Sequence, residues 1–127
     1  MIQAIGKPRT LANGLTHPLT PGIRAGDFVF VSGQLGMDDQ GVVVSDDIAA
    51  QTRHALERIR AILALAGTDL GAVVKVSVWV TDKAEFPAFN AAYREFFPER
   101  PPARATVVSD LMIAGAKVEI DAIAYVG

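Results

Sequence analysis

The stretch VVKVSVWV at residues 73–80 is the clearest strand signal in the sequence, and the fold class follows from it. β-Branched and aromatic residues dominate the stretch, as is typical of strands. Because side chains alternate between the two faces of a strand, one face is apolar and the other is mixed. The two faces hold Val74, Val76, Val78 and Val80 on one side and Lys75, Ser77 and Trp79 on the other.

An amphipathic helix is predicted before this strand, over residues 47–66. Ser45, Asp46 and Asp47 are favourable N-cap residues, and their acids suit the positive end of a helix. Gly67 is a natural residue for the position just after the last turn. Apolar or small residues recur at spacings of three and four and form one stripe. The stripe consists of Ile48, Thr52, Ala55, Ile59, Ile62, Leu63 and Ala66.

A second helix is predicted after the strand, over residues 84–97. Thr81 and Asp82 can cap its start. Pro98 ends it, because the residue before a proline avoids the helical region. Its apolar stripe consists of Phe86, Phe89, Tyr93 and Phe96 or Phe97.

The remaining strands give the order of elements. Strands are predicted at residues 28–34, 42–44, 104–109 and 117–126, whereas residues 1–26 read as loop with short strand pieces. The order is therefore β, β, α, β, α, β, β. Two helices with one apolar stripe each pack most simply on one face of a mixed sheet, which is an α+β fold.

The last strand shows what the other face of the sheet carries. Val118, Ile120, Ala122 and Ala124 alternate with Lys117, Glu119, Asp121, Ile123 and Tyr125. The second set mixes charges with large apolar side chains, as does the face that bears Trp79. This mixture favours a hydrated subunit interface. The alternative is an ordinary exposed sheet face with a few aromatic residues.

Composition bounds the class of protein. A chain of 127 residues, half of them hydrophobic, fits a single domain that spans residues 1–127. The formal net charge is 12 − 14 = −2, with no basic run, so nucleic acid is not an expected partner. There is no cysteine, and the two histidines, His17 and His54, have no ligand-like spacing, so no metal is expected. No segment is apolar enough to span a membrane, and the cytoplasm is the expected compartment.

Arg104 is the residue best placed for chemistry. It begins a predicted strand directly after the stiff segment Pro101-Pro102-Ala103. A guanidinium on a rigid strand end is well suited to bind a carboxylate through two hydrogen bonds. If Ala105 faces the helices, Arg104 shares the polar face with Glu119. The alternative is that Arg104 and Glu119 form a plain ion pair on neighbouring strands.

An ordered set of segments resembles the RidA (YjgF) family of small imine deaminases, over roughly residues 22–126. The two most telling segments are PPARATV at 101–107 and GAKVEIDAIA at 115–124. The other matching segments come earlier in the chain. They are VSGQLG at 31–36, the pattern D-x-x-x-Q formed by Asp47 and Gln51, LALAGTDLGAVVKVSVWVTD at 63–82 and FPAFNAAYREFF at 86–97.

The resemblance implies a fold like that of the small trimeric chorismate mutases, with active sites between the subunits of a homotrimer. It also implies hydrolysis of reactive enamines and imines, such as 2-iminobutanoate and 2-iminopropanoate, to 2-keto acids and ammonia. No cofactor is expected. A small 2-imino or 2-enamino acid would be the ligand.

The resemblance also implies roles for particular residues. Arg104 would bind the substrate carboxylate, and Glu119 would orient or activate the attacking water. Gly33 and Thr106 would offer backbone groups to the substrate, while Ser32 and Asn90 would line or support the site.

Two positions depart from the family pattern: Ala105 follows Arg104 where serine is common, and the more important departure is at residue 19. Leu19 stands in the segment Pro18-Leu19-Thr20-Pro21, where many active members carry a tyrosine that reaches the site. This departure leaves two rivals open. One is a deaminase of a bulkier aminated acid in the same superfamily. The other is a non-catalytic trimer that binds a small carboxylate or a protein partner.

Overall fold

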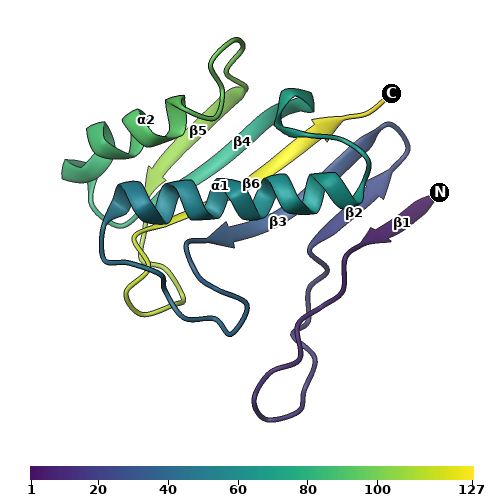
Figure 1. The fold of residues 1–127 in the computed structure, drawn as a ribbon, viewed down its shortest axis with the longest axis horizontal. Coiled ribbons are helices and arrows are strands. Elements are labelled where there is room, and N and C mark those ends of the chain that lie inside the picture. The colour runs from purple at the N-terminus through teal and green to yellow at the C-terminus, as the bar shows by residue number, and fades with distance from the viewer.

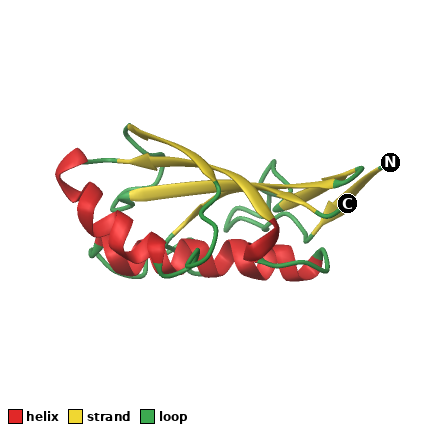
Figure 2. Ribbon diagram, turned by 90° about the horizontal axis from the view of Figure 1, so that it is seen from above, coloured by secondary structure: helices red, strands yellow, loops and turns green.

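A computed structural model describes residues 1–127 and shows one six-stranded mixed sheet with both helices on one face (Figures 1 and 2). The strand order is β1-β2-β3-β6-β4-β5. Only β4 and β5 pair in parallel. The strands are β1 (Ile2–Ile5), β2 (Gly22–Ala25), β3 (Phe28–Leu35), β4 (Val73–Val80), β5 (Ala103–Val108) and β6 (Val118–Tyr125), and the helices are α1 (Ile48–Leu65) and α2 (Phe86–Arg94). The predicted α+β architecture is confirmed.

The core fills the layer between the sheet and the helices. Val76, Val78 and Val80 of β4 face the helices, each only 1% exposed. All four residues predicted for the inner face of β6, Val118 to Ala124 in alternation, are buried as well. Figure 2 shows the opposite face of the sheet without a covering helix. Neither helix is long and apolar enough to cross a bilayer.

Three expectations about the elements are wrong. Residues 42–44 form no strand and make one bridge, between Met37 and Val43. Instead, β1 and β2 form an antiparallel pair that extends the sheet beside β3. A shift in the pairing of β4 with β6, between Val73 and Lys75, turns Val73 into the core in place of Val74. The second helix is also shorter than predicted, because a 3₁₀ turn at Lys83–Glu85 precedes it.

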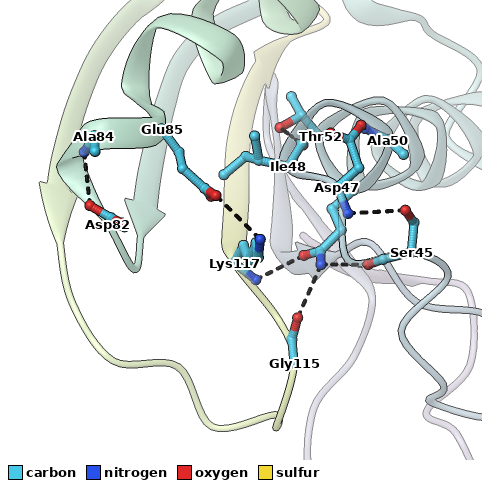
Figure 3. A network of polar contacts seen from close by, with 11 residues as sticks. Ser45, Asp47, Ile48, Ala50, Thr52, Asp82, Ala84, Glu85, Gly115 and Lys117 are labelled. Carbon is cyan, nitrogen blue, oxygen red and sulfur yellow. Dashed lines mark hydrogen bonds and ion pairs between the residues drawn. The ribbon is translucent and has the colours of Figure 1, made fainter.

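The first helix starts where the sequence predicts. The side chain of Asp47 accepts a hydrogen bond from the backbone N–H of Ala50, which caps α1. One turn later, the buried amide of Gln51 joins the helix to the segment before β6. Its partners Ser45, Gly115 and Lys117 are labelled in Figure 3. Its Nε2 donates to the carbonyls of Ser45 and Gly115, and its Oε1 accepts from the Lys117 backbone N–H. These three bonds fix the start of the strand that carries Glu119.

Candidate active site

Glu119 lies on the open face of the sheet, beside a bulge in β3. The pairing of β3 with β6 shifts between Val31 and Gln34, and the bulge contains Ser32 and Gly33. A Cβ on Gly33 would overlap the Glu119 carboxylate and lie 3.0 Å from its Cδ. The backbone of Gly33 does not have a positive φ, so this position needs glycine for space rather than for conformation. The carboxylate therefore rests directly over the bulge.

The surroundings of Glu119 favour its protonated form. Burial raises the pKa of the Glu119 carboxyl, and the neighbouring Asp121 carboxylate raises it further. Asp121 is held in place because its Oδ1 accepts the backbone N–H of Ser77 at 3.0 Å. A carboxylate with a raised pKa is a better proton acceptor than an ordinary one, which suits a general base.

The hydroxyl of Ser32 ties the segment that carries Leu19 to the bulge. Ser32 Oγ donates to the Thr20 carbonyl at 2.6 Å, and the Ser32 backbone N–H donates to the Pro21 carbonyl at 2.9 Å. Leu19 lies next to these contacts and is 43% exposed. The Ser32 hydroxyl is thus engaged with backbone, so its contribution is to position this edge of the site.

Arg104 sits in an aromatic setting provided by α2. Its Nη2 donates to Asn90 Oδ1 at 2.9 Å. The Cζ atom lies 5.6 Å, 5.3 Å and 4.8 Å from the ring centroids of Phe86, Phe89 and Tyr93. These contacts hold the guanidinium through its amide partner and through cation–π attraction. The half-buried cation belongs to none of the chain's four ion pairs.

The prediction that Arg104 shares a face with Glu119 is wrong. In the parallel pairing of β5 with β4, Arg104 lies opposite Val76, whose side chain is in the core. Arg104 therefore points to the helix side, while Ala105 is exposed on the other side. The strands are not neighbours either, since β4 separates β5 from β6. The alternative of a plain ion pair with Glu119 is excluded within one chain.

Thr106 follows Arg104 on the same face of β5. It lies opposite Val78, and its Oγ1 is buried without a hydrogen-bond partner in the chain. The chain thus divides the predicted residues into two groups. We call them the glutamate half (Leu19, Ser32, Gly33 and Glu119) and the arginine half (Asn90, Arg104 and Thr106).

Sequence reasoning missed two residues that belong to these halves. Asp121 lies two residues from Glu119 on the same face, so strand alternation alone could have indicated it. The sequence pattern places Tyr93 only in the apolar stripe of the second helix, because its contact with Arg104 depends on the packing of that helix over β5. A cavity of about 530 Å³ between α1 and the segment around Phe96 contains none of the predicted site residues. No three His, Asp or Glu side chains gather closely enough to hold a metal ion.

Comparison with known proteins identifies the family of the chain. A model of the family described as Endoribonuclease L-PSP matches residues 12–126. The chain belongs to the YjgF/RidA family. One YjgF/RidA relative, the 3-aminoacrylate deaminase RutC of Acinetobacter baylyi, is 42% identical over 122 residues, which cover 95% of this chain and 93% of the relative.

Two solved structures of the YjgF/RidA type extend the comparison to the fold. The Rid family protein YyfA of Yersinia pestis has a TM-score of 0.87 at 31% identity, over 99% of this chain and all of the other. TdcF of E. coli, solved with bound serine, has a TM-score of 0.81 at 30% identity, over 98% and 97% of the two chains. The expected chorismate-mutase-like α+β fold is confirmed.

Proposed function

We propose that this protein hydrolyses small 2-imino and 2-enamino acids, of the 2-iminobutanoate and 2-iminopropanoate type, to 2-keto acids and ammonia without a cofactor. The observation that carries the proposal is the half-buried Arg104 guanidinium, held by Asn90 and three rings and without a carboxylate partner. A desolvated cation is costly unless an anion meets it. The carboxylate of an imino acid would supply that anion next to the reacting carbon.

The proposed chemistry needs one base and one anchor. Water adds to the iminium carbon while Glu119 takes one of its protons, and the electron pair of the C=N bond moves to nitrogen. The C–N bond of this carbinolamine then breaks as Glu119 returns the proton to nitrogen, and ammonia leaves. The carbonyl forms as the hydroxyl proton passes to the departing ammonia, which is released as ammonium, and Glu119 is again a carboxylate. An enamine first takes a proton at carbon to reach the same iminium. Since the iminium is already electrophilic, positioning and one general base suffice.

We further propose that the single domain of residues 1–127 works as a homotrimer. The open sheet face exposes large side chains, with Phe28, Phe30 and Tyr125 exposed by 41%, 44% and 49%. A second copy that covers this face would bury them. Contact between copies would also bring the arginine half of one protomer to the glutamate half of the next, which a single chain keeps apart. Light scattering should give three times the protomer mass at micromolar concentration, whereas a monomer would contradict this assembly.

A second candidate has support from one relative. The Acinetobacter baylyi deaminase is named for 3-aminoacrylate, an enamine whose nitrogen lies one carbon further from the carboxylate. Leu19, in place of a tyrosine, is compatible with such a different or bulkier aminated acid. The cytoplasm and the absence of nucleic-acid and membrane partners stay predictions.

The proposed activity can be tested directly. A dehydratase that acts on serine or threonine generates 2-iminopropanoate or 2-iminobutanoate in situ, and semicarbazide traps the imine that escapes hydrolysis. The protein should suppress the trapping and speed keto-acid formation. Equal trapping with and without the protein, for both imines and for 3-aminoacrylate, would favour the non-catalytic reading, in which the trimer only binds a carboxylate or a protein.

A further inference from the structure

The hydroxyl of Tyr93 is buried without a partner. The residue is only 6% exposed, and its hydroxyl makes no hydrogen bond of regular geometry. The Arg104 guanidinium is the one donor close enough for a side-chain hydrogen bond to affect the pKa of Tyr93. The ring already packs well, 5.4 Å from the ring of Phe89 and 4.9 Å from that of Phe97. A phenylalanine could make the same ring contacts. A buried hydroxyl without a partner costs about 1–3 kcal/mol, so its presence here needs a reason beyond packing.

The closest cation to this ring is Arg104. Its Cζ lies 4.8 Å from the Tyr93 centroid, nearer than to either phenylalanine ring. Burial raises the pKa of Tyr93 to about 12, and the Arg104 guanidinium opposes this rise. The hydroxyl therefore stays neutral at ordinary pH, and its oxygen can accept a hydrogen bond from an N–H group.

Most N–H donors of the Arg104 guanidinium have no hydrogen-bond partner in the chain. It carries five N–H bonds in one plane, of which one is used by Asn90 Oδ1. A carboxylate bound side by side with the guanidinium takes two parallel N–H bonds on one edge. The donors on the remaining edge are free to meet an acceptor on the α2 side. Asn90 and Tyr93 are three residues apart on that helix and so lie on the same face of it.

We propose that Tyr93 is a positioning residue for Arg104. When a substrate carboxylate occupies one edge of the guanidinium, the Tyr93 oxygen accepts an N–H from the other edge. The Tyr93 oxygen and the Asn90 side chain together fix the orientation of the guanidinium plane. The bound carboxylate is therefore held at one angle to the reacting carbon. The inference rests on the proposed function, because it assigns Arg104 to carboxylate binding.

The substitution Tyr93→Phe tests this role, because it removes only the hydroxyl. We use 2-oxobutanoate as a probe of the carboxylate site. Its dissociation constant and KM should both rise by roughly 10- to 100-fold, since this is the worth of a hydrogen bond to a charged group. The value of kcat should change less than about twofold. The melting temperature of the free protein should stay level or rise, because an unpaired buried hydroxyl is lost.

Two further variants separate this inference from the proposed function. In an Arg104→Lys background, Tyr93→Phe should have no further effect on probe binding, because an ammonium has no plane to orient. If Tyr93→Phe lowers only the melting temperature and leaves probe affinity and KM unchanged, while Arg104→Ala weakens both, Tyr93 only packs and the inference is overturned. If Arg104→Ala also leaves probe binding unchanged, the proposed function itself fails.

Discussion

Gly33 and Glu119 share one space: the Glu119 carboxylate occupies the place where a side chain at position 33 would begin. The Glu119 side chain of β6 can pack against the bulge in β3 only because residue 33 has no side chain. The backbone at Gly33 suits any residue, so the match acts on the carboxylate rather than on the fold.

Gly33→Ala should therefore lower activity without unfolding the protein. The added methyl group displaces the Glu119 carboxylate, and a shift of about 1 Å can cost about 100-fold in rate. We expect kcat/KM to fall by roughly 10- to 100-fold, with an unchanged circular dichroism spectrum. In a Glu119→Ala background the same substitution should cost nothing more. An equal loss in both backgrounds would mean that Gly33 acts independently of Glu119.

The pH dependence should report the interaction of Glu119 with Asp121. Burial and the Asp121 charge raise the pKa of Glu119, and the proposed base works as the carboxylate. Activity should therefore fall on acidification at a higher pH than for an ordinary glutamate. Asp121→Asn removes the like charge and keeps an acceptor for the Ser77 N–H, so the acidic limb of kcat/KM should move to lower pH.

The exposed Asp46 supplies the matched control for that experiment. Asp46→Asn makes the same change in net charge away from the open sheet face. It should leave the acidic limb of the kcat/KM profile at the same pH. An acidic limb that Asp121→Asn does not move would show that another group controls it.

Leu19 should influence which imine is preferred. If the segment tied down by Ser32 borders the cleft, the leucine makes that border more apolar than a tyrosine would. Leu19→Tyr should then raise activity on 2-iminopropanoate relative to imines with longer tails, as measured by the ratio of kcat/KM values. An unchanged ratio would place Leu19 outside the cleft.

Arg104 should account for most of the substrate affinity. Removing one partner of a partly desolvated charged contact costs about 2–5 kcal/mol. Arg104→Ala should lower kcat/KM by roughly 30-fold to several thousand-fold. Arg104→Lys should recover only part of this, since lysine lacks the planar fork. Millimolar 2-oxobutanoate should raise the melting temperature of the wild type but not of Arg104→Ala; equal protection of both would contradict the role.

The elements that local patterns control were predictable from the sequence. Alternation in residues 73–80 and 117–126 marked two central strands, and Asp47 was identified as the start of the first helix. The pair of β1 and β2 was not, because four-residue strands among glycines and prolines carry little local signal and depend on pairing. Val74 was misplaced because alternation assumes an unbroken ladder, and β4 shifts register beside it.

The face of Arg104 could not be predicted for a different reason. β5 is an edge strand, and its small or apolar residues Ala105 and Val107 are exposed. Apolar character therefore did not mark the core side of this strand. The deciding contacts come from Asn90 and the rings of α2, and they depend on how that helix lies on the sheet. The sequence indicates candidate site residues, whereas tertiary packing determines the face of the sheet on which each of them lies.

The central claim is that Arg104 of one protomer and Glu119 of the next act on the same imine. Arg104→Ala and Glu119→Ala, each strongly impaired alone, can be unfolded together in equal amounts and refolded as mixed trimers. Random mixing gives an intact arginine half beside an intact glutamate half at about one quarter of the interfaces. Imine hydrolysis should therefore return to about one quarter of the activity of refolded wild type. If each protomer held a complete site, the mixture would stay as inactive as its two components.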